Sequence, residues 1–390
     1  MGCVSEKTED LPEHLSTIEN LTVYSEHPTP ATDIELIREI SFGDTDEVFF
    51  GRMVENIAVD QTGKVFIADL AENTIQLFDS DGTYLQNFGR SGQGPGEFEA
   101  IWDFDIHDGK VHVLDYRNSK ISVFDVNTLE HIRDHDVSLH NRRDNQPSWI
   151  SWARDEGFFY SPTDLFVRAD GKYLLLFSDG GVGSAHNIDG RTYEGSIFDP
   201  QTDEFTQHDV VSFEWTGQVL VHDERGNVMV MFRVPYKRSS LFDYTNGQFV
   251  HGWSEEMLFR FYDGDGKHQK AIYYSYSNAV LYLDDVLMHY EGSGDDFKHA
   301  IRSDDKPETW PAFQSLTLDD ENRLWISTIT EDQDSYKWWV LDETGDLIAT
   351  FSWPRNYNLK LVKDGYAYTM ERDLETGQKE VVRYKINVGI

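Results

Sequence analysis

Cysteine is almost absent from this chain: a single one, Cys3, occurs in 390 residues. One cysteine excludes an intramolecular disulfide and any zinc site built from cysteine ligands. Long apolar runs are absent too, since none approaches the roughly 18 residues that a membrane-spanning helix needs. With 39% hydrophobic residues, the chain still has enough apolar side chains to bury a core.

Basic residues are scarce as well. Lys and Arg number 34 against 70 Asp and Glu, which gives a formal net charge of −36. A nucleic acid would meet a repulsive field, so no nucleic-acid partner is expected. An acid excess of this size fits adaptation to a salty medium, and the alternative is capture of cations or of cationic ligands.

Residues 1–32 are expected to form a disordered tether. After Gly2-Cys3, the stretch up to Asp33 is rich in Ser, Thr, Glu and Pro and shows no apolar periodicity. Gly-Cys before such a linker resembles the mature start of a bacterial lipoprotein. The resemblance implies a lipid anchor at Cys3 as the only membrane contact, and a location at the bacterial cell envelope, periplasmic or outer-surface, or outside the cell.

Two alternatives for Cys3 stay open. N-myristoylation wants a hydroxyl at position 6, where Glu6 stands. The cysteine could also be incidental to a frayed terminus. The lipoprotein hypothesis expects the full-length product to fractionate with membranes in its own cell and to lose that partitioning in Cys3→Ser; unchanged partitioning would refute it.

From about residue 52, short β-rich runs alternate with Asp-Gly, Gly-Asn and Asn-Gly turns, and helical spacing is nearly absent. Residues 57–88 read as four strands in a row. The next unit repeats their order: Asp69 corresponds to Asp115, and Phe78 to Phe124, each 46 residues later. A fixed period of this size in short strands is typical of the blades of a β-propeller.

The blade count depends on the middle of the chain. If residues 257–276 are the outer hairpin of a blade that starts at Val219, the ring has six blades; if they form a separate blade, it has seven. The last blade shows only three strands, and residues 34–42 are expected to supply the fourth and close the ring. We predict an all-β, six-bladed β-propeller that occupies residues 33–390 as a single domain.

The connector of residues 88–98, FGRSGQGPGEF, resembles that of NHL repeats, and so does the Asp-x-x-Gly-x-x-x-x-x-Asp spacing that begins at Asp60. The resemblance is specific over residues 52–138 and weak over 310–352, and the middle blades lack the connector. More broadly, the chain resembles the secreted six-bladed propeller lipoproteins of Bacteroidetes-type bacteria. Most of those proteins have no assigned activity, so the resemblance implies a fold rather than a reaction.

Complete catalytic motifs are missing from the sequence. There is no His-Glu-x-x-His and no Gly-x-Ser-x-Gly elbow. The run GQGPG at 92–96 is not followed by a helical pattern, and Pro95 lacks an amide donor, so this run is interpreted as a connector. The recurring Asp60, Asp69, Asp115 and Asp319 are expected to accept backbone N–H bonds in turns.

Candidate site residues are those that begin the innermost strands, because these positions surround one mouth of a propeller's central channel. Oxygen ligands for calcium or magnesium are predicted at Glu55, Asp103 and Asp164. That set is similar to the cation site of gluconolactonase-like propellers. Ligand-binding side chains are predicted at Trp102, Gln314 and Asn358. The ordinary alternative is that polar residues line a water-filled channel and that tryptophans pack between blades.

A basic cluster stands out against the acidic background. Arg233, Tyr236 and Arg238 lie close together with Lys237 in a loop that is expected to leave an inner strand. The cluster is predicted to bind an anionic group of a ligand, and the alternative is simple pairing with neighbouring acids.

Two functional hypotheses follow. The leading one is a non-enzymatic lipoprotein that binds a protein or carbohydrate at one rim of the propeller. The other is a divalent-cation-dependent hydrolase or lyase, similar to lactonases, in which calcium at the channel mouth polarises a lactone or acidic sugar. The sequence leaves open whether there is any catalysis.

Overall fold

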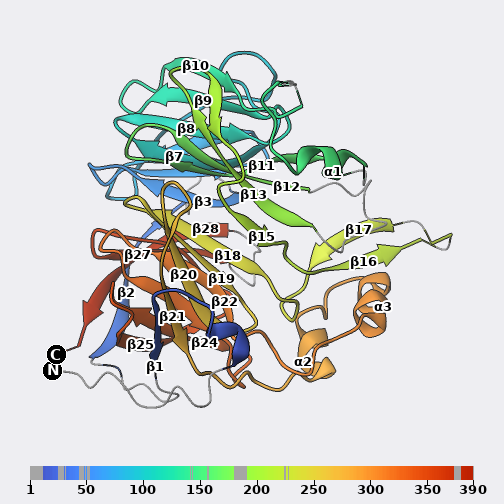
Figure 1. Cartoon of the computed structure of the whole chain (residues 1–390). Coiled ribbons are helices and arrows are strands. Elements are labelled where there is room, and N and C mark those ends of the chain that lie inside the picture. Colours follow the sequence, from blue (N-terminus) through green and yellow to red (C-terminus); the bar gives the residue numbers. More distant parts are fainter. Residues whose placement is uncertain are drawn as a thin grey trace.

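Short strands separated by tight turns build a ring of antiparallel sheets in the computed structural model (Figure 1). The structure describes residues 12–24, 30, 32–43, 48, 50, 53–140, 142, 144–155, 158–179, 191–223, 225–226, 228–372 and 379–389, without the side chains of residues 53–55. Among these residues, no helix has the length and apolar character needed to cross a membrane.

Blades 1 and 2 correspond to the two clearest sequence repeats. Their strands run from the innermost to the outermost as follows: blade 1 has β3 (Met53–Val59), β4 (Val65–Asp69), β5 (Thr74–Phe78) and β6 (Tyr84–Phe88), and blade 2 has β7 (Ile101–His107), β8 (Lys110–Asp115), β9 (Lys120–Asp125) and β10 (His131–Asp136). The expected role of the turn aspartates is confirmed, since Asp60 Oδ1 accepts the N–H groups of Thr62 and Lys64 at 2.8 and 3.0 Å.

Blades 3 to 5 are also four-stranded, and blade 3 carries an extra strand. Blade 3 has β11 (Tyr160–Val167), β12 (Tyr173–Asp179), β13 (Thr192–Asp199) and β14 (Glu204–Gln207), with β15 (Ser212–Glu214) on β13; blade 4 has β18 (Ser240–Thr245), β19 (Gln248–Trp253), β20 (Met257–Asp263) and β21 (His268–Tyr274); blade 5 has β22 (Phe313–Leu318), β23 (Leu324–Thr328), β24 (Ser335–Leu341) and β25 (Leu347–Pro354).

Blade 6 joins the two ends of the chain. It contains β26 (Asn358–Lys363), β27 (Tyr366–Arg372), β28 (Lys379–Val388) and, outermost, β2 (Thr32–Phe42). β2 pairs antiparallel with β28, from Ile34 opposite Val388 to Phe42 opposite Val381. The prediction that an N-terminal strand completes the last blade is confirmed, and the ring has six blades.

The start of the fourth blade differs from the prediction. The run from Val219 forms β16 (Gln218–His222), which pairs only with β17 (Val228–Arg233) and lies outside the ring. The outer hairpin of residues 257–276 belongs instead to the blade that starts at Ser240. A hairpin alone has the same period-2 pattern whether or not it joins a blade, so the sequence did not separate the two cases.

The β16–β17 hairpin packs with two short helices, α2 (Leu283–Met288) and α3 (Asp295–Ser303), on the right of Figure 1. We call these four elements the side module. Their shared core contains Val219, Tyr236, Val286, Ile301 and Trp310. A further helix, α1 (Ile150–Asp155), buries Ile150 and Ala153 against blades 2 and 3.

Part of the segment predicted to be a tether is packed on the propeller. The 3-10 helix η1 (Glu13–Leu15) buries Leu15 against blade 4, and β1 (Leu21–Tyr24) pairs in parallel with β21. Tyr24 stacks on Tyr274 with ring centroids 4.6 Å apart. These contacts are tertiary and leave no local periodicity, which is why the sequence indicated disorder here. Cys3 lies outside the described residues.

The closing strand gives the first prediction. Phe42 is fully buried, with its ring centroid 5.8 Å from that of Phe78, whereas Ile37 on the same strand is 43% exposed. Phe42→Ala should lower the free energy of unfolding by about 3–5 kcal/mol because it leaves a cavity where blade 6 meets blade 1. Ile37→Ala should cost less than about 1 kcal/mol. Urea unfolding measures both, and equal losses would contradict closure through this contact.

Candidate functional site

Each innermost strand has one edge that pairs with no other strand and faces the channel. The N–H and C=O groups on such an edge need partners. In this ring, side chains of one blade bind backbone groups of the next blade. Donor, acceptor and heavy-atom distance are, in ring order: Asn56 Nδ2 to Phe104 O, 2.7 Å; Leu165 N to Asp103 Oδ2, 2.7 Å; Val167 N to Asp105 Oδ2, 3.1 Å; Leu318 N to Asp243 Oδ2, 2.7 Å; Asp364 N to Asp320 Oδ2, 2.9 Å; Lys363 Nζ to Val59 O, 2.6 Å.

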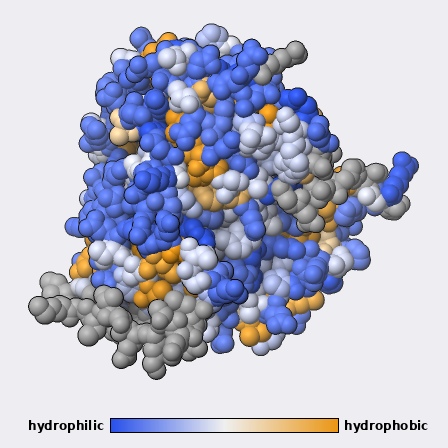
Figure 2. Space-filling view, viewed as in Figure 1, coloured by the Kyte–Doolittle hydropathy of each residue, from blue (hydrophilic) through white to orange (hydrophobic). Residues whose placement is uncertain are grey.

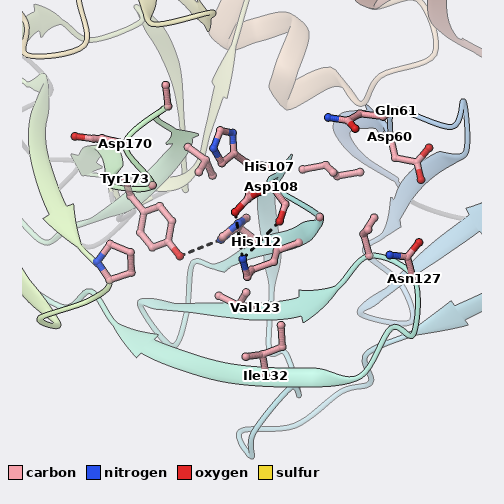
Figure 3. A pocket seen from close by; sticks show the side chains of 18 of the residues that line it. Asp60, Gln61, His107, Asp108, His112, Val123, Asn127, Ile132, Asp170 and Tyr173 are labelled. Carbon is pink, nitrogen blue, oxygen red and sulfur yellow. Dashed lines mark hydrogen bonds and ion pairs between the residues drawn. The ribbon is translucent and has the colours of Figure 1, made fainter.

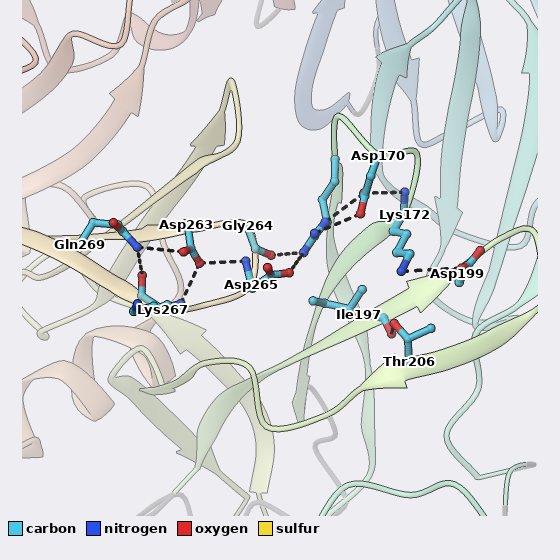
Figure 4. Close-up of polar contacts among 11 residues, drawn as sticks. Asp170, Lys172, Ile197, Asp199, Thr206, Asp263, Gly264, Asp265, Lys267 and Gln269 are labelled. Carbon is cyan, nitrogen blue, oxygen red and sulfur yellow. Dashed lines mark hydrogen bonds and ion pairs between the residues drawn. The ribbon is translucent and has the colours of Figure 1, made fainter.

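We call these contacts seam bonds, and among the described residues the seam between blades 3 and 4 has none at the channel. The two blades are joined by aromatic packing, with the ring centroids of Phe166 on β11 and Phe249 on β19 5.8 Å apart. Farther out, Arg168 after β11 donates to the carbonyl of Gly264 and to Asp265 in the β20–β21 turn. Figure 4 shows these two turns side by side, with Asp170 and Asp265 facing each other across the contact.

We call the seam between blades 3 and 4 the open seam. The carboxylate on its inner strand that corresponds to the seam-bonding carboxylates of other blades is Asp164 on β11. It lies at the same bulge-related position of its strand as Asp103 does on β7. The hydrogen bond that the described residues give it comes from the neighbouring Thr163 hydroxyl, at 2.8 Å. Asp164 is therefore left to face the channel cavity, whereas Asp103 uses both oxygens for backbone N–H groups.

A cavity of about 1110 Å³ fills the channel and extends into the open seam. Trp102 lies at its N-terminal mouth, where the chain enters the inner strands, and is 48% exposed. Its ring centroid is 5.2 Å from that of Tyr116. Arg233, which ends β17, also lines the cavity and donates from Nη2 to the Tyr193 hydroxyl at 3.3 Å.

The channel acids share a low-dielectric environment. Burial raises the pKa values of Asp164 and Asp243 to about 6. Burial and, secondarily, the charge of Asp164 raise the pKa of Asp103, while the nearby Arg233 partly offsets the effect on Asp164. Asp103, Asp164 and Arg233 are thus close enough to act on one another across the mouth.

The structure brings together Trp102, Asp103, Asp164 and Arg233 and separates the other predicted residues from them. Gln314 and Asn358 do not line the cavity. Tyr236 is buried and donates to Asp304 at 2.8 Å. Arg238 binds Glu255 and the carbonyl of Thr309, which holds the side module in place.

Only part of the predicted cation site lies among the side chains that the structure describes. The side chain of Glu55 lies outside the described residues, and the rest of the described chain holds no group of three His, Cys, Asp or Glu side chains that could bind a metal. Calcium at the mouth stays a prediction.

Several cavity residues were missed by the sequence argument. Asp105 follows Asp103 by two residues on one strand, so period-2 alternation could have found it. Asp243 was missed because the blade that contains it was expected to start at Val219 and starts at Ser240 instead. Tyr193 and Trp215 reach the cavity from the irregular part of blade 3, where no local pattern points to the channel.

A second cavity, of about 960 Å³, lies at the opposite end between blades 1 to 3 (Figure 3). Its polar groups are used by the fold. Tyr173 and His112 are hydrogen bonded at 2.9 Å between blades 3 and 2, and His135 binds Asp203 at 2.6 Å. Burial lowers the pKa of His112 to about 4, which suits a neutral structural histidine.

Comparisons with known proteins agree with this architecture. The model of a family described as a 6-bladed beta-propeller matches residues 33–178. No curated protein matches the chain. A candidate exported protein from Bacteroides fragilis NCTC 9343 is similar in structure, with a TM-score of 0.51 at 12% identity over 95% of this chain and 100% of that one. A member of the DUF4221 family from Bacteroides vulgatus ATCC 8482 gives 0.53 at 13% identity over 92% and 99%.

The chain is therefore a six-bladed β-propeller, and the expected resemblance to bacterial propellers of this kind is confirmed. At these identities the two solved structures establish the fold alone.

The open seam predicts an unusual effect of pH on stability. Because the pKa of Asp164 is raised to about 6 in the folded protein, its contribution to stability is full below about pH 4 and is lost as the pH rises through 6. Asp164→Asn should thus be more stable than the wild type at pH 8, by up to roughly 2 kcal/mol, with the gain disappearing near pH 4.

Urea unfolding at pH 4, 6 and 8 measures this difference. The exposed Glu331 supplies the matched control, since Glu331→Gln should change stability by less than about 0.5 kcal/mol at every pH. An Asp164→Asn protein that is less stable than the wild type at pH 8 would contradict the assignment of Asp164 as an unpaired channel acid.

Proposed function

We propose that this protein is a non-enzymatic binding propeller that takes a saccharide at the N-terminal mouth of its channel. The observation that carries the proposal is the exposed Trp102 beside two polar side chains, Asp164 and Arg233, that the seams leave unused. An aromatic wall with a few convergent polar groups is the usual design of a small-ligand site.

The chemistry of the three side chains suits a sugar. An indole offers a flat apolar surface to the C–H face of a pyranose ring. Stacking the two removes apolar surface of both from water. A carboxylate accepts hydrogen bonds from ring hydroxyls and a guanidinium donates to them. Asp164 and Arg233 therefore supply complementary partners for neighbouring hydroxyl groups.

Acyl transfer would need an activated serine, and among the described residues the serine–histidine pair that borders the cavity does not provide one. Ser240 Oγ lies 2.9 Å from His251 Nε2, and Ser240 lines the channel. Burial lowers the pKa of His251 to about 3, so the imidazole is a poor base for the serine proton. Its Nδ1 atom has no hydrogen-bond partner among the described residues, so no third group orients the ring.

The proposal includes a location outside the cytoplasm, at the cell envelope or beyond it. It is supported by the structural similarity to the Bacteroides fragilis protein that is described as exported. Hydrophilic residues cover most of the face in Figure 2, and hydrophobic ones form separate patches. Membrane fractionation with Cys3→Ser tests this part independently of the ligand.

The ligand hypothesis is tested by calorimetric titration with a panel of neutral and acidic mono- and oligosaccharides. At least one should bind, and Trp102→Ala should weaken it roughly three- to tenfold through lost stacking. Trp152→Ala is the matched control, because Trp152 on α1 is 42% exposed but does not line the cavity. Binding that Trp102→Ala leaves unchanged, or a panel without any binder, would sink the proposal.

A further inference from the structure

We propose that the saccharide bound at the channel mouth carries a carboxylate and that Arg233 is the residue that selects it. This inference rests on the proposed function and names its ligand class. It starts from the geometry of the β16–β17 hairpin, which belongs to no blade and presents its open end to the cavity.

Arg233 and Gln218 face each other in register at that open end, and both line the cavity. The other end of the hairpin points away from the ring, as Figure 1 shows for β16 and β17. The hairpin thus places a guanidinium at the cavity from outside the ring of blades. The core of the side module fixes this placement, since Val219 and Val221 are buried in it.

The guanidinium of Arg233 is under-used. An arginine has five N–H donors in a planar fork, and the hydrogen bond found for this one among the described residues goes to Tyr193 alone. Two other arginines are fully employed by contrast: Arg168 binds Asp170 and Asp265, and Arg238 binds Glu255 and Thr309. A planar fork with free donors matches a carboxylate, which can accept two parallel hydrogen bonds.

The strongly acidic surface does not prevent this. Charges farther away than about 8–10 Å are largely screened at physiological salt. Close to Arg233, the charged or titratable groups are Asp164 on β11, Tyr193 on β13 and, beyond Asp164, Asp103 on β7. The hydroxyl of Tyr290, which follows α2, donates to the Arg233 carbonyl at 3.4 Å. Asp103 is held by backbone N–H groups, and Asp164 can take a proton near neutral pH when an anion arrives. A neutral Asp164 would then donate its proton in a hydrogen bond to the ligand.

Trp102, Asp103, Asp164 and Arg233 form a continuous row across the mouth, from β7 through β11 to β17. A ring stacked on the indole can therefore direct substituents toward the guanidinium along this row. Neutral sugars would gain the stacking and the hydroxyl contacts but not the charge-assisted pair.

The test compares ligands that differ only in charge: oligogalacturonate with its methyl ester, and oligoglucuronate with its methyl ester, each titrated calorimetrically at pH 6.5. At least one acid should bind at least about tenfold more tightly than its ester. Arg233→Met, which keeps the length of the side chain, should abolish the preference, because it weakens binding of the acid at least about tenfold more than binding of the ester. Arg225→Met is the control, because Arg225 lies at the far tip of the same hairpin.

The possible failures are distinguishable. If the esters bind in a Trp102-dependent manner and the acids bind no better, the carboxylate inference is wrong and the saccharide proposal stands. If Arg233→Met weakens acid and ester equally, Arg233 is not the selecting residue. If neither acid nor ester binds, this inference is overturned, and failure of the wider sugar panel would overturn the proposed function with it. Retained ester binding by Arg233→Met also shows that the variant is folded.

Discussion

The inner strand of every blade turns one unpaired edge toward the channel, and the backbone groups on that edge must find partners away from a neighbouring strand. Side chains of the preceding blade provide them. Asp103, Asp105 and Asp243 accept backbone N–H groups of the next blade, while Asn56 and Lys363 donate to backbone carbonyls. An acid-rich channel is therefore a structural requirement of this ring before it is a feature of any site, because a buried N–H without a partner costs about 1–3 kcal/mol.

Among the described residues, the seam without such a bond at the channel is the one between blades 3 and 4, where the chain departs most from a regular propeller. β15 and the β16–β17 hairpin are both inserted in the chain between blades 3 and 4, and Arg168 joins these blades at their outer turns. Among the described residues, Asp164 makes no seam bond at this point, and Arg233 reaches the cavity from a hairpin outside the ring. Asp164 and Arg233 thus both keep unused hydrogen-bonding capacity at a seam where contacts between the blades do not use them.

Much of the fold could be predicted from sequence because its signals are local. The 46-residue offset from Asp69 to Asp115 indicated the blades, and the missing fourth strand of the last blade indicated a closing strand at residues 34–42. The sites were harder, because they depend on the register within each inner strand. Asn358 was chosen by its place before a strand, but the bulge of β26 lies two residues later, and it is Lys360 that lines the cavity.

Long-range placement was beyond the sequence altogether. The three residues of the basic cluster, Arg233, Tyr236 and Arg238, are close in the chain but separate in the fold. Arg233 faces the channel, whereas Tyr236 binds Asp304, some seventy positions away, and Arg238 binds Glu255, seventeen positions away. The β16–β17 hairpin has the alternation of a blade strand pair, and only its packing on α2 and α3 reveals that it lies outside the ring.

The seam bonds are tested most directly by hydrogen–deuterium exchange of backbone amides. In Asp243→Ala, the amide of Leu318 loses its acceptor, so exchange in β22 should accelerate while the other inner strands keep their protection. Asp164→Ala, which removes a carboxylate without a seam bond, should leave the exchange of β18 as it is in the wild type. Unchanged protection of β22 in Asp243→Ala, or equal acceleration in both variants, would contradict the division of the channel acids into structural and free ones.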